Sequence, residues 1–343
     1  MPPITTIMTI LSLILGSLIT FSSHSWMLAW LGLELNTLAI IPLMTKSQHP
    51  RANEAATKYF LAQAMASALM MSAIILNNYL TGNLFFISHR ITPTLIFTVA
   101  LAIKMGMTPF HFWLPDVLQG LPLSTGLIMS TWQKFPSLAL FIQLSHHLDL
   151  KLLVPMGLAS TVVGALGGIN QTQIRKILAY SSIANLGWLA AVVKLCPHLA
   201  LFNFFIYAVL TSALFIMFMA LKALNMPKLM MSWANSPAIA SAAVLTLLSL
   251  AGLPPLTGFM PKLLITQELL NNDYILVTAI MFFTTLLTLF FYLRMAYIMT
   301  LTMSSSTSYS VAKWYRAPKS YSPIPVTLSI LLIVLLPLFP TVL

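Results

Sequence analysis

Four charged side chains stand inside long apolar stretches of this sequence: Glu34, Lys104, Lys134 and Lys262. Burial favours the neutral form of both a lysine and a carboxylic acid, whereas a nearby opposite charge favours the charged forms. A movement of one partner therefore changes how tightly the other holds a proton. We predict that these four residues take up and release protons.

These charges are costly, and each has a plainer alternative role. A charge at the centre of a bilayer costs about 2.5–3.5 kcal/mol on the insertion scale, unless it is neutral, paired or hydrated. Lys104 and Lys262 stand beside proline-rich stretches, where they could instead satisfy loose backbone carbonyls. His111 is a candidate relay between Lys104 and Lys134, with a hydrogen-bonded structural histidine as the equal alternative.

Two apolar stretches are interrupted by proline, at Met107–Pro115 and Leu253–Pro261. Proline has no backbone N–H and breaks the hydrogen-bond ladder of a helix. The carbonyls that are freed at membrane depth need protein or a wet cavity around them, so we expect both breaks to line a hydrated interior rather than face lipid. The residues that we assign to the breaks are Pro109, Pro115, Pro254 and Pro255.

The composition requires a membrane around these elements. The chain has 343 residues, of which 59% are hydrophobic and 7% charged, against roughly 25% charged in a soluble domain. A helix needs about 20 apolar residues to cross a bilayer. We predict an all-α integral membrane protein with about eleven spans, at 4–21, 25–44, 57–77, 92–107, 122–145, 150–168, 174–194, 198–222, 238–269, 274–302 and 323–342.

These spans form a single membrane domain, 1–343, with an internal repeat. Lys104 and Lys262 each stand beside a break and lie five predicted spans apart. Five is an odd number, so the two repeats, about 4–145 and 150–302, would be inverted across the membrane, and a final helix, 323–342, would follow. Discontinuous helices at matching places in inverted repeats indicate an ion site near the midplane.

Span 122–145 predicts the depth of Lys134, and the loop charges predict the orientation of the chain in the membrane. An unbroken helix over this span would put Lys134 about 18 Å from either end, too deep for its side chain to reach water. Ten loop lysines and arginines fall on the side of the N-terminus and three on the opposite side. Positive loops stay inside, so we expect the N-terminus inside and the C-terminus outside.

Familiar cofactor motifs are absent from the sequence. The single cysteine, Cys196, cannot hold an iron–sulfur cluster or form a disulfide within one chain. The sequence has no GxGxxG, GxxxxGK[ST], CxxC or HExxH pattern. The net charge of +11 is spread between apolar runs rather than gathered in one patch, so we expect neither a cofactor, nor a metal, nor nucleic acid on this chain.

The sequence resembles the antiporter-like membrane subunits of mitochondrial NADH–ubiquinone oxidoreductase, respiratory complex I, a family related to sodium/proton antiporters. The likeness covers almost the whole chain, although bacterial members have three more helices at the N-terminus. The segments that carry the resemblance are Trp30–Thr37, Glu54–Phe60, Lys104–Asp116, Ile174–Ile183 and Gly252–Lys262.

The resemblance implies roles for the same four charges. Glu34 and Lys104 would be the family's glutamate–lysine pair, Lys134 its central lysine, and Lys262 the terminal charge of a proton path. It also implies that NADH, flavin, iron–sulfur clusters and most of the ubiquinone site belong to other subunits.

Three hypotheses then remain open. The first is a proton-translocating core subunit of NADH:ubiquinone reductase without a redox centre, in the mitochondrial inner membrane beside other antiporter-like subunits and lipids. Its N-terminus would be on the matrix side and its C-terminus on the intermembrane-space side. The others are a stand-alone cation/proton antiporter and a scaffold subunit whose charges are vestigial.

Overall fold

The computed structural model describes residues 3–47, 49–82 and 91–301, and within these ranges every regular element is a helix. The predicted final helix at 323–342 lies outside the described residues. The chain divides into two compact units: residues 1–160 with 189–197 form unit 1, and residues 161–188 with 198–343 form unit 2.

Among the described residues, six helices are long and apolar enough to cross a membrane: α1 (Pro3–Ser22), α2 (Trp26–Met44), α3 (Pro50–Thr81), α8 (Leu150–Ile169), α10 (Pro197–Ala220) and α15 (Ile275–Leu301). Two apolar helices are shorter, α4 (Ile91–Met105) and α13 (Pro237–Ala251). A 15-residue helix is about 22 Å long and does not cover a hydrocarbon core of about 30 Å, so each needs the chain beyond its end to complete a crossing.

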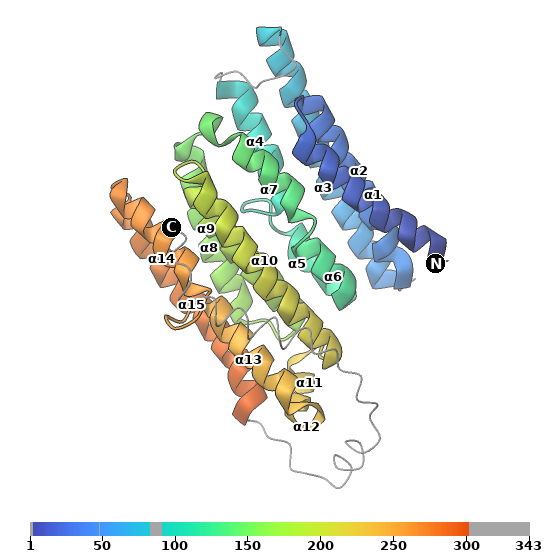
Figure 1. The fold of residues 1–343 in the computed structure, drawn as a ribbon, viewed down its shortest axis with the longest axis vertical. Helices are drawn as coiled ribbons and strands as arrows, with labels where there is room; N and C mark the ends of the chain where they lie inside the picture. Colours follow the sequence, from blue (N-terminus) through green and yellow to red (C-terminus); the bar gives the residue numbers. More distant parts are fainter. Residues whose placement is uncertain (1–2, 48, 83–90, 302–343) are drawn as a thin grey trace. The chain divides into compact units, whose positions relative to one another are not determined.

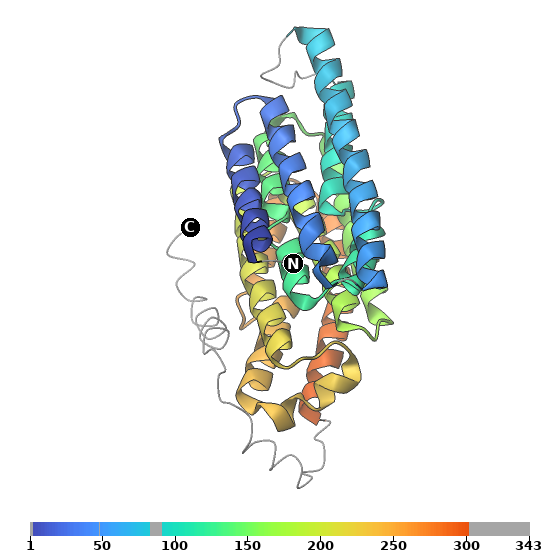
Figure 2. The same ribbon diagram turned by 90° about the vertical axis from the view of Figure 1, so that its right-hand side faces the viewer.

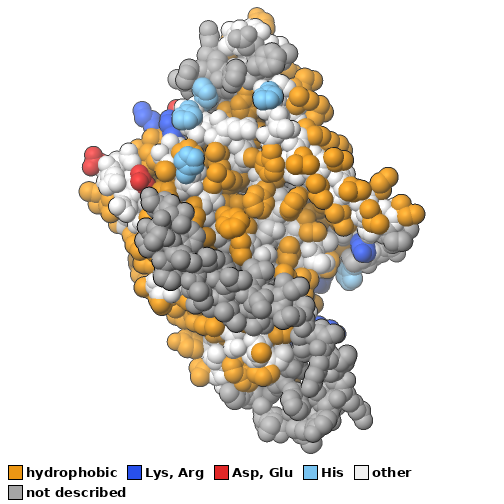
Figure 3. All heavy atoms as spheres, in the orientation of Figure 1, with side chains coloured by type: hydrophobic (Ala, Val, Ile, Leu, Met, Phe, Trp, Pro, Cys, Tyr) orange, Lys and Arg blue, Asp and Glu red, His pale blue; other side chains and the backbone are white. Residues whose placement is uncertain are grey.

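The surface of the described residues has the character of a membrane protein. Outside the part drawn in grey, hydrophobic side chains are abundant on the face seen in Figure 3, and charged side chains are few and lie near its edges. On α1, for example, Ile7, Leu15 and Leu18 are each more than half exposed. Lipid accepts this apolar surface, whereas water would not.

Unit 1 is built on α1, α2 and α3, which lie side by side in Figures 1 and 2. Helix α3 packs against α4 and against the short helix α5 (Trp113–Gly120). Helix α7 (Lys134–Gln143) contacts α1, α2 and α4, and α6 (Leu123–Ser130) precedes it in the chain. The helices that carry Glu34, Lys104 and Lys134 therefore belong to one packed group.

Unit 2 is organised around α15, which packs against α13 and α14 (Phe259–Asn271), and against the short helices α11 (Met226–Met230) and α12 (Ser232–Asn235). The helix α9 (Ile174–Val192) contributes its first part to this unit and lies close to the end of α8. A Cβ on Gly164 would stand 2.6 Å from the backbone nitrogen of Ala184, so the two helices touch at this glycine.

The helix path is broken at both proline-rich stretches, and at a third place. At the first stretch, α4 ends at Met105 and α5 begins at Trp113. At the second, α13 ends at Ala251 and α14 begins at Phe259. Pro115 was wrongly assigned to the first break: it lies buried in the first turn of α5, a position that tolerates proline. The third interruption separates α6 from α7 at Thr131–Gln133, inside the span that we had expected to be continuous.

Candidate functional site

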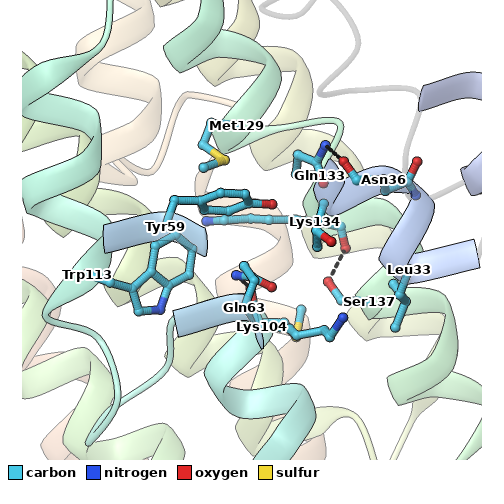
Figure 4. A pocket seen from close by; sticks show the side chains of 12 residues that line it. Leu33, Asn36, Tyr59, Gln63, Lys104, Trp113, Met129, Gln133, Lys134 and Ser137 are labelled. Atoms are coloured by element: carbon cyan, nitrogen blue, oxygen red, sulfur yellow. Dashed lines mark hydrogen bonds between the residues drawn. The ribbon is translucent and has the colours of Figure 1, made fainter. Parts of the chain in front are cut away.

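A small cavity in unit 1 brings together Lys104 and Lys134. It has a volume of about 20 Å³ and is lined by residues of the helices α2 to α7, which is room for one or two water molecules. In Figure 4 the side chain of Lys134 runs beside Tyr59, and that of Lys104 extends toward Ser137 and Leu33. Both lysines are buried, at 7% and 3% exposed for Lys104 and Lys134.

The end of α4 positions Lys104, which lies in its last turn. Gly106 follows with φ +80°, a left-handed conformation that glycine adopts without strain. Its N–H donates to Ala102 and Ile103, and the N–H of Met107 donates to Ala102, as in a Schellman cap. Because the helix ends here, the carbonyls of its last turn need other donors.

Side chains from other elements supply those donors. The Trp113 indole N–H donates to the Ile103 carbonyl at 3.1 Å, and Gln63 Nε2 donates to the Lys104 carbonyl at 3.4 Å. Gln63 lies on α3 and is buried. The Trp113 bond therefore joins the start of α5 to the last turn of α4, and the Gln63 bond joins α3 to the backbone of Lys104.

Lys134 begins α7 rather than lying in the middle of a helix, which corrects the sequence-based expectation. Two residues later Pro136 has no N–H for the Trp132 carbonyl, and proline suits the first turn of a helix. The neighbouring Gln133 donates from Nε2 to the Asn36 carbonyl at 3.2 Å, which ties this interruption to α2. The depth of Lys134 therefore comes from packing and not from distance along one helix.

Glu34 is half-buried on α2, two residues before Asn36, and it does not line the cavity. Its charge acts on Lys104 and on Tyr59. Within the described residues no ion pair joins Glu34 to Lys104 within 4.0 Å, and neither Lys104 Nζ nor Glu34 Oε2 has a hydrogen-bond partner there. A contact through one water molecule stays a prediction.

In unit 2, Lys262 reaches back from α14 to the end of α13. Its Nζ donates to the Ala251 carbonyl at 3.2 Å, and both groups are buried. Gly252 ends α13 with φ +85°, as Gly106 ends α4. The alternative role for Lys262, a donor to a loose carbonyl at the break, therefore has a bond to support it.

The prolines of the breaks face outward in this chain. Pro109, Pro254 and Pro255 are all exposed, which counts against the expectation that the breaks line an interior. The two lysines beside the breaks point inward instead. His111 is buried and stacks on Phe112 with ring centroids 4.2 Å apart. It does not line the cavity that Lys104 and Lys134 share.

Sequence reasoning missed the polar groups around the two lysines. Tyr59, Gln63, Gln133 and Ser137 all line the cavity. A signal was present, because polar side chains inside apolar stretches are costly in a membrane and mark functional positions. Which of them meet depends on the packing of separate helices, which no local pattern encodes.

Solved structures share this fold. A chain of respiratory complex I from Thermus thermophilus with bound aureothin matches with a TM-score of 0.84 and 26% identity, over 96% of this chain and 77% of that chain. A chain of the membrane-bound sulfane sulfur reductase, an archaeal respiratory membrane complex, has a TM-score of 0.86 at 18% identity, over 97% and 72% of the two chains. A chain of the Mrp complex from Dietzia sp. DQ12-45-1b has a TM-score of 0.78 at 18% identity, over 95% and 74%. The fold thus defines an antiporter-like, multi-pass membrane protein.

Sequence comparison identifies the family to which the chain belongs within this class. Residues 23–288 match the family described as "NADH:quinone oxidoreductase/Mrp antiporter, TM", and residues 289–343 match "NADH dehydrogenase subunit 2 C-terminus". NADH-ubiquinone oxidoreductase chain 2 of Aquarana catesbeiana is 49% identical, over 100% of this chain and 99% of the relative. The protein of that name from Latimeria chalumnae is also 49% identical, over 99% and 98%. This chain belongs to the NADH:quinone oxidoreductase/Mrp antiporter transmembrane family.

Proposed function

We propose that this chain is a proton-translocating membrane subunit of a respiratory NADH:ubiquinone oxidoreductase. The family and the full-length relatives support this function, as does the likeness to a complex I chain. One observation in the structure carries the mechanism: Lys104 and Lys134 share a buried cavity with room for water. A proton would pass between the two lysines through water held in this cavity.

Energy would reach this site as a change in charge. A positive charge on Lys104 favours the ionised form of Glu34 and disfavours a second positive charge on Lys134 in the same cavity. A change at Glu34 therefore alters the proton affinity of Lys104, and Lys104 in turn alters that of Lys134. Lys134 would lose its proton in part of the cycle. Lys262 would be the terminal charge of the path.

The proposal includes a topology. Eleven spans, of which the last is 323–342, would form two inverted repeats, with the N-terminus on the matrix side of the mitochondrial inner membrane and the C-terminus on the intermembrane-space side. The bias of ten positive loop residues against three supports this orientation. The neighbours would be other antiporter-like subunits of the complex and lipids.

The proposal also assigns no cofactor to this chain. NADH, flavin, iron–sulfur clusters and ubiquinone would be bound by partner subunits. The lone Cys196 and the lack of nucleotide-binding motifs in the sequence support this division. The chain would therefore be part of an enzyme without carrying a redox centre.

The test replaces Lys134 in the assembled complex. Lys134→Ala and Lys134→Arg should both lower proton translocation per NADH in reconstituted vesicles, the second because arginine stays protonated. Lys151→Arg is the matched control, because Lys151 is exposed and lines neither lysine cavity. Normal translocation in the arginine variant would show that Lys134 need not lose its proton. Normal translocation after both Lys134→Ala and Lys262→Ala would leave only the scaffold hypothesis.

A further inference from the structure

A second small cavity, in unit 2, is lined by Lys262 together with several polar side chains. It measures about 10 Å³, which is room for about one water molecule. Lys262 lines it together with polar side chains of α9 and α15. The polar side chains that matter here are Ser181, Asn185, Thr284, Thr285 and Thr288, which we call the hydroxyl cage.

The hydroxyl hydrogens of the cage, and one of the two amide hydrogens of Asn185, are bonded to backbone carbonyls. Each donates to a backbone carbonyl of the helix that carries it, three or four residues earlier. The bonds run from Ser181 to Leu178 at 2.8 Å, Asn185 to Ser181 at 3.0 Å, Thr284 to Met281 at 2.8 Å, Thr285 to Phe282 at 2.7 Å and Thr288 to Thr285 at 2.8 Å.

This arrangement leaves acceptors free. A hydroxyl has one hydrogen and two lone pairs, and an amide oxygen also keeps two lone pairs. With their hydrogens bound to the helices, the four hydroxyl groups can offer only oxygen lone pairs to the cavity, whereas Asn185 keeps one N–H besides its amide oxygen. A cavity of this kind favours a cation or a donor over an anion.

Lys262 is the donor that lies against it. A charged lysine carries three hydrogens and accepts none, and one of them bonds to the Ala251 carbonyl. No acidic side chain lines this cavity among residues 91–301, and Tyr292 is the one other titratable group on its wall. Tyr292 contacts the hydroxyl of Ser181. Two hydrogens of the ammonium group are therefore left for oxygens other than carboxylates.

We propose that the hydroxyl cage binds the charged form of Lys262, directly or through one water, and so takes the place that Glu34 has beside Lys104. The cage residues position and stabilise the charge, and the hydroxyls do not relay protons, because their hydrogens stay on the helix carbonyls. This inference rests on the proposed role of Lys262 in proton transfer. Its sharpest prediction concerns Thr284 and Thr288.

The experiment removes single oxygens at constant shape. Thr284→Val and Thr288→Val each replace a hydroxyl by a methyl group in the assembled complex, and Thr288→Ser keeps the oxygen. The matched control is Thr278→Val: Thr278 lies on the same helix, is 3% exposed and donates to Ile275 at 2.7 Å, but does not line the cavity. The readout is proton translocation per NADH in vesicles as a function of pH.

The two valine variants should lose proton translocation at lower pH than the unchanged complex. Without an acceptor oxygen, the charged form of Lys262 is less favoured, so Lys262 gives up its proton in less alkaline solution. We expect the alkaline limb of the profile to move down by about one pH unit, the lower end of what a hydrogen bond to a charged group contributes. Thr288→Ser should restore the original profile, and Thr278→Val should leave it in place.

Two results would overturn the proposal that the hydroxyl cage binds Lys262. Valine variants with the same profile as Thr278→Val would show that the oxygens do not act on Lys262. A serine variant shifted as far as the valine variant would show that packing, not the oxygen, matters. Lys262→Ala separates this inference from its premise: if that variant translocates protons normally, the role of Lys262 itself is wrong.

Discussion

Adding one methyl group to Gly252 tests whether the end of α13 holds Lys262 in place. Gly252 has φ +85°, and a Cβ built there would stand 2.9 Å from Lys262 Nζ and 3.3 Å from its Cδ. The backbone does not obstruct the new methyl group, but the end of a flexible side chain does. In Gly252→Ala the amine therefore moves, and its bond to the Ala251 carbonyl is lost.

Two costs follow, and they act on different properties. An alanine in the left-handed region costs about 1–2 kcal/mol, which lowers the stability of the fold. Losing a hydrogen bond to a charged group costs about 1.5–3 kcal/mol, and this cost falls on the charged form of Lys262. The second cost corresponds to a loss of about tenfold or more in proton affinity, since about 1.4 kcal/mol is a factor of ten.

Gly82→Ala separates the two costs. Gly82 ends α3 with φ +70°, so alanine there is strained to a similar extent, but nothing lies within 4 Å of its built Cβ. Both variants should lower the thermal stability of the assembled complex by similar amounts. Only Gly252→Ala should lower proton translocation per NADH in vesicles. Equal translocation in the two variants would refute the idea that the position of Lys262 Nζ matters.

Three further predictions follow from the contacts of unit 1 and from the sequence. Trp113→Phe removes the indole donor to the Ile103 carbonyl and should destabilise the complex by about 1–3 kcal/mol, measured as thermal unfolding; unchanged stability would mean that another donor replaces it. Lys58 pairs with Asp116 at 2.8 Å and with Glu54 at 3.5 Å, but all three are exposed, so Lys58→Met should leave thermal stability nearly unchanged at physiological salt. The purified chain alone should not oxidise NADH, and turnover in a spectrophotometric assay would contradict the division of cofactors.

Much of the fold could be predicted from apolar runs. Span 4–21 was expected where α1 runs from Pro3 to Ser22, and span 274–302 where α15 runs from Ile275 to Leu301. Length and hydrophobicity suffice for such helices, because the bilayer imposes both. The breaks beside Lys104 and Lys262 were also visible, since proline and glycine mark them directly.

The interruption before Lys134 was missed for a physical reason. Pro136 alone does not break a membrane helix, because neighbouring helices can satisfy the carbonyl that it frees. The break forms here together with side-chain bonds: Thr131 donates to its own helix at Leu127, and Gln133 donates to the carbonyl of Asn36. The last of these bonds joins residues far apart in the sequence, so only the packed structure reveals it.

Each unit contains a buried lysine, and different groups stabilise its positive charge in the two units. Lys104 lies in the last turn of α4, and Lys262 near the start of α14 brings its amine to the carboxyl end of α13. Backbone carbonyls at a helix carboxyl end favour a positive charge. Near Lys104 the other charge is the carboxylate of Glu34, whose field reaches Lys104. Beside Lys262 there are the Ala251 carbonyl and the hydroxyl cage, whose dipoles are fixed. Under the proposed function, Lys104 responds to a change of charge at constant geometry, whereas Lys262 responds only when the distance to these oxygens changes.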